Sequence, residues 1–308
     1  MDHTFRRSLS SGTHIANSTK EEALANAARQ ALEELYRYNT ISDHPVGQGG
    51  CGQVWKCHDL LFDRVVAIKT ISEFLSLSLN DTARRTFVRE AQAGARLGRI
   101  SRHVVKVIDL GMIRDTPYFV MEWIERPPGK SKIDLSGDVG AVSVARMKKI
   151  MFEVSDAVAT AHQSGIVHSD ISPWNFLYDP AEKVYKLSDF GLLKIIEETL
   201  VSRGSGSLLV GGRADFFPQS VRAGAEPISY ASDVYALAVT LRVILEGEGC
   251  LSRNGGKILP TPGVIPVRHE GGRDAPSQVR LLVERFVDGH GPGDTVIDFQ
   301  RMLQQIPS

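Results

Sequence analysis

Oxygen-bearing side chains lie in two short stretches of the sequence that could together act on a phosphate group. Asp170 and Asn175 belong to HSDISPWN (168–175), and Asp189 lies in SDFG (188–191). A carboxylate and a carboxamide from neighbouring loops suit Mg²⁺, which prefers hard oxygen ligands and keeps positions for water and nucleotide phosphates. We therefore expect Asn175 and Asp189 to hold a metal ion, which leaves Asp170 to accept a proton from a hydroxyl group.

A glycine-rich stretch, VGQGGCGQV (46–54), places Gly47, Gly49 and Gly52 in the pattern G-x-G-x-x-G. By itself the pattern is weak, because a flexible turn would show it as well. A dinucleotide-binding fingerprint should open a helix, whereas these glycines open a strand-like run that a second one follows. This context favours a glycine loop whose backbone N–H groups approach phosphates.

Lys69 ends the apolar run VAIK (66–69) and is a candidate to meet the same phosphates. A lone lysine is usually part of the solvated surface. A lysine at the end of an apolar strand is better placed to reach a ligand, but it needs a carboxylate to hold it. Glu90, in the helical stretch 84–97, is the candidate for that carboxylate.

The elements around these residues change in type along the chain. Short runs with turn signals between them predict strands in the first half, and apolar stripes at helical spacing predict helices in the second half. The expected strands are 53–59, 64–71, 103–111 and 118–124, and the expected helices are 84–97, 147–161, 229–245, 277–288 and 294–305. Strands followed by helices indicate an α+β protein in two lobes.

Four regions follow from this pattern. A polar, Ser-rich tail (1–17) precedes an N-terminal helix (18–40), which opens with the capping-box signature STKE. The helix could pack on the domain that follows it or bind a partner, and packing is the simpler hypothesis. The N-lobe is expected at 41–124 and the C-lobe at 125–308, because the loop-like stretch that starts at residue 125 is rich in Pro and Gly.

Composition excludes several classes of partner. Lys and Arg together number 36, as do Asp and Glu, so no basic field favours nucleic acid or an anionic membrane. The apolar run 235–245 is too short to span a bilayer and suits a buried helix. The three cysteines lack metal-type spacing, and the start of the sequence has no apolar signal region, so we expect a reduced, cytoplasmic setting.

In their order and spacing, these motifs resemble those of eukaryotic-type protein kinases of the Ser/Thr type, over about residues 41–245. The resemblance implies a bilobal fold, with a small antiparallel β-sheet and one main helix in the N-lobe and a mostly helical C-lobe. It implies ATP and Mg²⁺ as cofactors and a protein that carries Ser or Thr as the substrate.

The resemblance also implies a role for each matching residue. Lys69, paired with Glu90, would hold the α- and β-phosphates, and Asp170 would act as base or orient the hydroxyl group. Asn175 and Asp189 would hold Mg²⁺. The glycines Gly47, Gly49 and Gly52 would cover the phosphates. The residues implied at the adenine are Val46, Val54, Ala67 and Leu177 on its faces, Met121 as the gatekeeper, and the backbone of Glu122 and Ile124 at its edge.

The catalytic loop departs from the family pattern at two positions. Ser169 replaces an Arg that pairs with a phosphorylated activation segment, so we expect no activation-loop phosphate switch. Ser172 replaces a Lys that neutralises the transferring phosphoryl group, as in the RIO-type kinases. Asp233 resembles the buried helix residue that braces this loop.

Three functions fit these observations. The leading hypothesis is a Ser/Thr protein kinase. A small-molecule kinase of the same fold is the second, since such enzymes also often lack the loop Lys. The third is an ATP-binding pseudokinase scaffold, although such a scaffold usually loses Lys69, Asp170, Asn175 or Asp189, and all four are present here.

Overall fold

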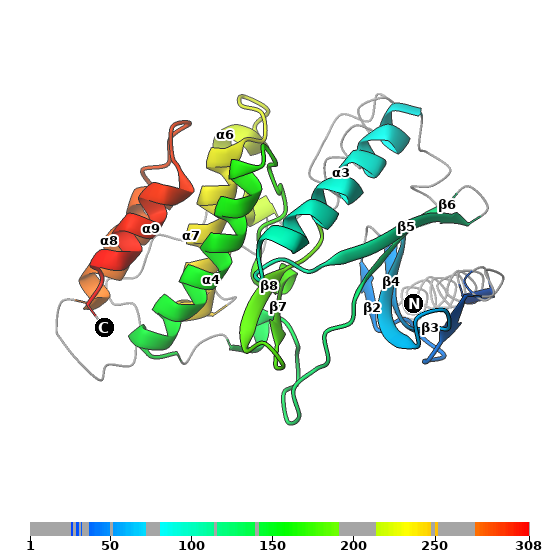
Figure 1. Cartoon of the computed structure of the whole chain (residues 1–308). Helices are drawn as coiled ribbons and strands as arrows, with labels where there is room; N and C mark the ends of the chain where they lie inside the picture. The colour runs from blue at the N-terminus through cyan, green and yellow to red at the C-terminus, as the bar shows by residue number, and fades with distance from the viewer. Residues whose placement is uncertain are drawn as a thin grey trace, which may run out of the picture. The chain divides into compact units, whose positions relative to one another are not determined.

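The computed structural model describes residues 26, 29–30, 32, 37–49, 52–71, 81–113, 116–138, 142–190, 214–247, 250–251 and 275–307 (Figure 1). The predicted tail 1–17, most of the predicted helix 18–40 and the stretch 191–213 lie outside these residues. By its internal contacts the chain forms two units. Unit 1 comprises Met1–Leu79 and Val107–Trp123, and unit 2 comprises Asn80–Lys106 and Ile124–Ser308.

Unit 1 is built on an antiparallel sheet in the order β1-β3-β4-β6-β5, with β2 paired to β3. Strand β3 alternates between buried and less buried residues, which is the pattern of a strand with two different faces. The strands are β1 Tyr38–Thr40, β2 Gly47–Gly49, β3 Gly52–Asp59, β4 Arg64–Ile71, β5 Val107–Ile113 and β6 Thr116–Glu122.

One face of this sheet packs into the core of unit 1. The side chains of this core come from β1, β3, β4 and β6, and Leu32 joins them with 0% of its surface exposed. The residues of the core are Leu32, Tyr38, Trp55, Cys57, Val66, Ile68, Tyr118 and Val120. Leu32 belongs to the predicted N-terminal helix, and its burial favours packing over a free helix.

The end of the predicted N-terminal helix was wrong. The described residues 26, 29–30 and 32 are helical, but Tyr38–Thr40 forms strand β1. Tyr38 pairs with Asp59 of β3, and its ring is 1% exposed. Pairing with an existing strand and burial of an aromatic ring outweigh helix propensity at these positions.

In its described residues, unit 2 is mostly helical and forms one two-stranded sheet, the β7–β8 hairpin (Figure 1). Its longer helices match the predicted ones within a few residues. The elements are α3 Asp81–Ile100, η1 Leu135–Asp138, α4 Val144–Gln163, η2 Pro173–Asn175, β7 Phe176–Asp179, β8 Val184–Leu187, η3 Ala214–Phe216, α6 Gln219–Arg222, α7 Tyr230–Glu246, α8 Ala275–Val287 and α9 Val296–Gln305.

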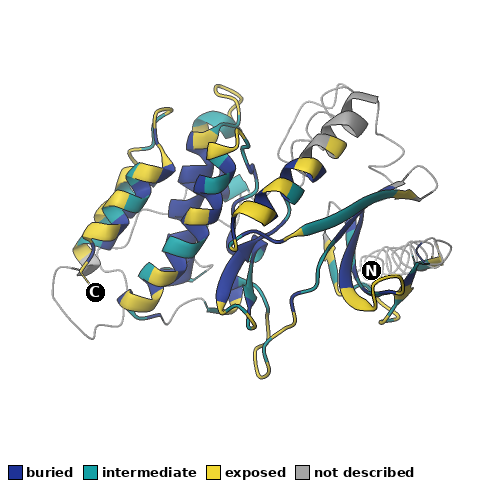
Figure 2. Cartoon of the chain, viewed as in Figure 1, coloured by how far each residue is buried: buried dark blue, intermediate teal, exposed yellow. Residues whose placement is uncertain are grey.

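The core of unit 2 is centred on α4 and α7. Helix α4 begins at the N-cap Ser143, whose hydroxyl accepts a hydrogen bond from the N–H of Arg146, and α7 begins with a capping box of Ser229 and Ser232. Residues 231–245 of α7 are all buried, so this helix is enclosed on every side (Figure 2). Such a helix gives buried side chains a fixed frame.

Helix α3 groups with unit 2 by its contacts, although it lies within the range 41–124 that was predicted for the N-lobe. Leu97, near its C-terminal end, and Val104 just beyond it are both 0% exposed in the core that contains α4. Among the described residues, no helix is both long and apolar enough to cross a membrane.

Candidate active site

The buried carboxylate of Asp233 fixes the backbone of the loop between α4 and β7. Asp233 lies in the first turn of α7 and is 2% exposed. Its Oδ2 accepts a hydrogen bond from the N–H of His168 at 2.7 Å, and its Oδ1 accepts one from the N–H of Ser169 at 2.9 Å. Nε2 of His162 lies 3.0 Å from the same Oδ2. The expected brace is therefore confirmed, and it acts directly before Asp170.

His168 links this loop to the strand end that precedes Asp189. Its Nδ1 accepts a hydrogen bond from the N–H of Asp170 at 3.2 Å, so the neutral ring carries its proton on Nε2. Nε2 then donates to the carbonyl of Ser188 at 2.9 Å. The ring also meets Phe190 edge-on, with 4.7 Å between the ring centroids. Both ring nitrogens of His168 are therefore used to position backbone groups.

Asn175 brings the three predicted catalytic and metal residues of unit 2 together. Its Nδ2 donates to the carbonyl of Asp170 at 2.7 Å and to Oδ2 of Asp170 at 2.8 Å. Its own carbonyl accepts hydrogen bonds from the N–H and the hydroxyl of Ser188 at 2.8 and 3.1 Å. Because Ser188 directly precedes Asp189, Asp170, Asn175 and Asp189 share one small region.

The donor set of this region fits Mg²⁺. Two acceptors on Asp170 fix the orientation of the Asn175 amide, so Oδ1 of Asn175 lies on the opposite side of the amide group. That amide oxygen and the carboxylate of Asp189 are hard oxygen ligands of the kind that Mg²⁺ prefers. The residues present therefore suit the ion that the sequence analysis implied.

Two residues of the site adopt left-handed backbone conformations. Ser169 has φ of 70° and Asp189 has φ of 65°. A left-handed conformation costs a residue with a side chain about 1–2 kcal/mol, although Asp tolerates it better than most. At Ser169 the hydrogen bond from its N–H to Asp233 offsets part of this cost. Such strain persists where surrounding contacts determine the backbone, as they do here.

Ser172 occupies an enclosed position. It is 1% exposed and is the N-cap of η2, with extended backbone angles (φ −164°, ψ 159°). A small hydroxyl side chain suits such a place, whereas a lysine ammonium would have to extend out of it to avoid the cost of burying a charge. The absence of the family lysine therefore agrees with the local packing of this chain.

In unit 1, Lys69 lies on the face of the sheet opposite the unit 1 core. Gly47 pairs with Val54, Val54 with Lys69, and Lys69 with Phe119. Side chains two residues apart in a strand share a face, so Ala67, which pairs with Met121, faces the same side. Lys69 is 7% exposed. The sheet register therefore gathers predicted phosphate-binding and adenine-binding residues on one face.

The glycine-rich stretch forms a tight hairpin at the edge of this face. Strands β2 and β3 pair in a register that joins Gly49 to Gly52, and the N–H of Val46 donates to the carbonyl of Val54 at 2.8 Å. Gly52 has φ of 143°, a conformation that side chains rarely adopt. The two residues between Gly49 and Gly52, one of which is Cys51, lie outside the described part of the chain.

The remaining predicted residues are placed as follows. Glu122 ends β6, where it pairs with Val66, and Ile124 is 6% exposed directly after Trp123. Leu177 lies on β7 opposite Lys186 of β8. Glu90 lies in α3, but its side chain is outside the described residues, so its pairing with Lys69 stays a prediction.

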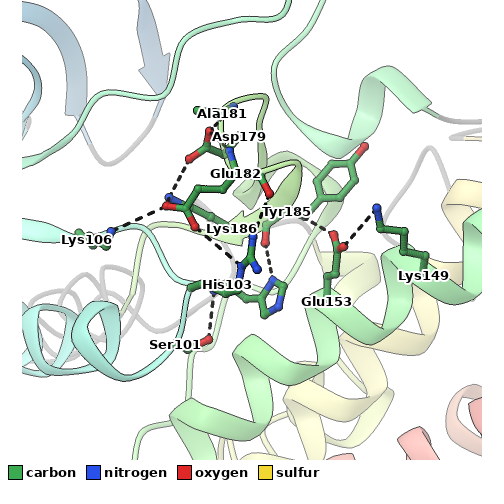
Figure 3. Close-up of polar contacts among 11 residues, drawn as sticks. Ser101, His103, Lys106, Lys149, Glu153, Asp179, Ala181, Glu182, Tyr185 and Lys186 are labelled. Carbon is green, nitrogen blue, oxygen red and sulfur yellow. Dashed lines mark hydrogen bonds and ion pairs between the residues drawn. The ribbon is translucent and has the colours of Figure 1, made fainter.

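A buried ion-pair network anchors the β7–β8 hairpin, and it was not predicted from the sequence. Lys186 is 0% exposed, and its Nζ lies 2.8 Å from Asp179 Oδ2 and 2.9 Å from Glu182 Oε1 (Figure 3). Glu182 also meets Arg102 and Lys106 at 3.8 Å each. This network stabilises the hairpin that follows Asn175. The alternation of acidic and basic residues in DPAEKVYK (179–186) is the only signal the sequence offers for it.

Comparison with known proteins agrees with this geometry. The model of the protein kinase domain family matches residues 40–261. The serine/threonine-protein kinase PrkC of Bacillus subtilis is 34% identical over 203 residues, which cover 66% of this chain and 30% of PrkC. The serine/threonine-protein kinase PknK of Mycobacterium tuberculosis is 29% identical over 289 residues, which cover 90% of this chain and 24% of PknK.

Solved structures show the same fold. The crystal structure of the Mycobacterium tuberculosis PknI kinase domain superimposes with a TM-score of 0.63, covers 88% of this chain and is 19% identical. The fold and the site thus define a protein of the kinase class, and the match to the family model over most of the chain shows that it belongs to the protein kinase domain family. The chain spans less than a third of the length of PrkC and PknK.

Proposed function

We propose that this chain is the catalytic part of an ATP- and Mg²⁺-dependent Ser/Thr protein kinase. The observation that supports the proposal is the hydrogen-bonded set of Asp170, Asn175 and Ser188, which brings the residue before Asp189 close to Asp170 and is next to the backbone held by Asp233. Phosphoryl transfer needs positioned oxygen ligands and a group that orients the hydroxyl, and this set supplies both. The relatives PrkC and PknK carry the name of serine/threonine-protein kinases.

Each residue of unit 2 has a distinct role in the proposal. The carboxylate of Asp170 orients the acceptor hydroxyl and takes its proton, while Nδ2 of Asn175 keeps that carboxylate in place. Oδ1 of Asn175 and the carboxylate of Asp189 hold Mg²⁺, which neutralises charge on the phosphates when it is bound. Asp233 and His168 touch none of the reacting atoms and act as positioning residues.

The residues of unit 1 bind the nucleotide. Lys69 supplies a cation to the α- and β-phosphates, and the backbone of the Gly47–Gly52 hairpin approaches the phosphates where side chains are absent. Val54, Ala67 and Met121 offer an apolar surface to the adenine. Their common face of the sheet, opposite the unit 1 core, supports this assignment.

Regulation by an activation-loop phosphate is not required in this proposal. Ser169 stands where the family places the Arg that meets such a phosphate, and its N–H is already held by Asp233 at 2.9 Å. The loop backbone is thus ordered by a contact within unit 2 that needs no added charge. The kinase is therefore expected to transfer phosphate without prior phosphorylation.

One assay separates the three functions that fit the sequence. Purified wild-type chain, Asp170→Ala and Lys69→Ala are incubated with labelled ATP and Mg²⁺, with casein or myelin basic protein as the acceptor. Label on Ser or Thr with wild type, and loss of label in both variants, supports the proposal. Equal and negligible transfer in all three, with ATP binding retained, indicates a pseudokinase. ADP formed only when metabolites are added, with no labelled protein, indicates a small-molecule kinase.

A further inference from the structure

A charged cavity lies in unit 2 among segments that the proposed chemistry does not use. Its volume is about 340 Å³, within the range of ligand sites. Three segments line it: the stretch 127–138, helix α4 and the β7–β8 hairpin. Figure 1 shows α4 running beside this hairpin. None of Asp170, Asn175 and Asp189 lines the cavity, so it is separate from the candidate active site.

The carboxylates that line the cavity already form hydrogen bonds or ion pairs with neighbouring groups. Asp138 accepts hydrogen bonds from Lys130 and Arg146 at 2.7 Å each and from the hydroxyl of Tyr185. Burial alone would raise the pKa of Asp138, but these donors lower it below its ordinary value, so the carboxylate stays ionised. Its side chain is 13% exposed, against 41% for Lys130 and 52% for Arg146. The cations therefore face solvent more than the carboxylate does.

Glu153 is likewise a mostly buried carboxylate beside a more exposed cation. Its Oε2 accepts a hydrogen bond from the N–H of Tyr185 at 3.0 Å, and its Oε1 lies 3.9 Å from Lys149 (Figure 3). Glu153 is 11% exposed and Lys149 is 66% exposed. The third carboxylate, Asp134, accepts a hydrogen bond from the N–H of Ser136 at 3.0 Å.

The cavity therefore presents a net positive surface above an apolar floor. Its cationic lining residues are Lys130, Lys132, Arg146, Lys149 and Lys183, against the carboxylates Asp134, Asp138 and Glu153. The apolar part of the lining is formed by Ile133, Ile150 and the rings of Tyr178 and Tyr185, whose centroids are 5.2 Å apart. Cations from three segments around an apolar floor suit an extended acidic segment better than a compact phosphate group.

Lys183 adds a second observation. It lies in the turn of the β7–β8 hairpin with φ of 57°, where Gly or Asn would be free of most of the strain. Its side chain is exposed. A lysine in this strained, exposed turn lowers the stability of the fold relative to Gly or Asn. Strain of this kind is often retained where a residue serves a function.

We propose that this cavity docks an acidic segment of a protein substrate, in which Asp and Glu residues flank one apolar side chain. The cations of the three segments meet the carboxylates, and Ile133, Ile150 and Tyr178 receive the apolar side chain. The identification of the bound protein as a substrate rests on the proposed kinase function. The docking itself does not, because it uses no nucleotide and no catalytic residue.

Binding is tested without ATP, by fluorescence anisotropy of a labelled peptide in which Asp and Glu residues surround a single Phe. The variants are Lys132→Glu with Lys183→Glu, and Lys183→Asn alone. The matched control is Arg96→Glu with Arg99→Glu, which changes the net charge equally at exposed positions of α3. We expect the affinity to fall about tenfold in the double variant, to fall less in Lys183→Asn, and to stay unchanged in the control. Added salt should weaken binding to the wild type.

The stability of Lys183→Asn separates docking from folding. Asn tolerates the left-handed turn, so this variant should melt at the wild-type temperature or above while binding the peptide more weakly. Wild-type affinity in the double variant, or equal binding of a peptide with Lys in place of the acids, would overturn the proposal. So would binding of tripolyphosphate with no binding of the acidic peptide, which would indicate a site for small anions. Because Asp170→Ala should bind the peptide like wild type, a failure of docking is distinct from a failure of catalysis.

Discussion

Removal of the Asp233 carboxylate should release the catalytic loop without removing any catalytic group. In Asp233→Ala, the N–H groups of His168 and Ser169 lose their carboxylate acceptor at 2.7 and 2.9 Å. Hydrogen bonds to charged groups are worth about 1.5–3 kcal/mol each. Two of them give about 3–6 kcal/mol, and Ser169 also loses the contact that offsets the cost of its left-handed backbone.

Hydrogen exchange measures this effect where it occurs. Since about 1.4 kcal/mol corresponds to a factor of ten, amide exchange at His168 and Ser169 should become at least about 100-fold faster in Asp233→Ala. The turnover number should fall, because Asp170 follows directly in the chain. Asp233→Asn should give an intermediate effect, since one amide oxygen can replace only one of the two acceptors.

The control is Asp156→Ala, which removes an exposed carboxylate from α4. It should leave both the exchange rates and the turnover number at their wild-type values. Wild-type exchange at His168 and Ser169 in Asp233→Ala, together with unchanged turnover, would refute the role assigned to Asp233.

Three further predictions concern stability. Gly111→Ala should lower stability by about 1–3 kcal/mol, because a Cβ at Gly111 would overlap the ring of Tyr118. The control Gly293→Ala should be nearly neutral, since nothing lies within 4 Å of a Cβ at that position. Equal melting temperatures of the two variants would contradict this prediction. Lys186→Met should lower the free energy of unfolding in denaturant by about 3–5 kcal/mol, because two carboxylates lose a fully buried cation. A decrease smaller than the one caused by replacing a surface lysine with Met would contradict this prediction. Burial lowers the pKa of His290 despite the nearby carboxylates of Asp294 and Glu226. As the pH falls below about 6.5, this histidine therefore takes up a proton in the unfolded chain before it does so in the folded protein. The free energy of unfolding should therefore decrease below that pH, and the decrease should be smaller in His290→Asn. The same pH dependence in the variant and the wild type would show that His290 does not cause it.

The catalytic loop was the most predictable part of the structure. The spacing of Asp170, Asn175 and Asp189 fixed which residues must meet, and the buried helix at 229–245 was clear from its apolar run. Such features can be read from residue types and spacing within short stretches of the sequence, although contacts with Asp233 and Ser188 hold the loop in place. The expected strands 64–71 and 118–124 and both closing helices also appeared within a few residues of their predicted bounds.

Some of the missed features depend on contacts between distant parts of the chain. Strand β1 exists because Tyr38 pairs with Asp59 and packs in the unit 1 core, and neither interaction is visible in the local sequence. The network of Lys186 was missed for a different reason: its partners Asp179 and Glu182 are near in the sequence, but a lysine normally predicts solvent exposure. The charged cavity is lined by three segments that follow one another between residues 127 and 185, and only the folded structure shows that their cations lie around one space.

The measurement that tests the central claim most directly is the rate of phosphate transfer from ATP to a protein substrate by wild type and by Asp170→Ala, with the labelled amino acid identified. The proposed function predicts phosphoserine or phosphothreonine from wild type and a rate that is lower by about 100-fold or more in the variant, as for the loss of a general base. Phosphate transfer that is equal in the two proteins would contradict it, because Asp170 would then have no part in the reaction.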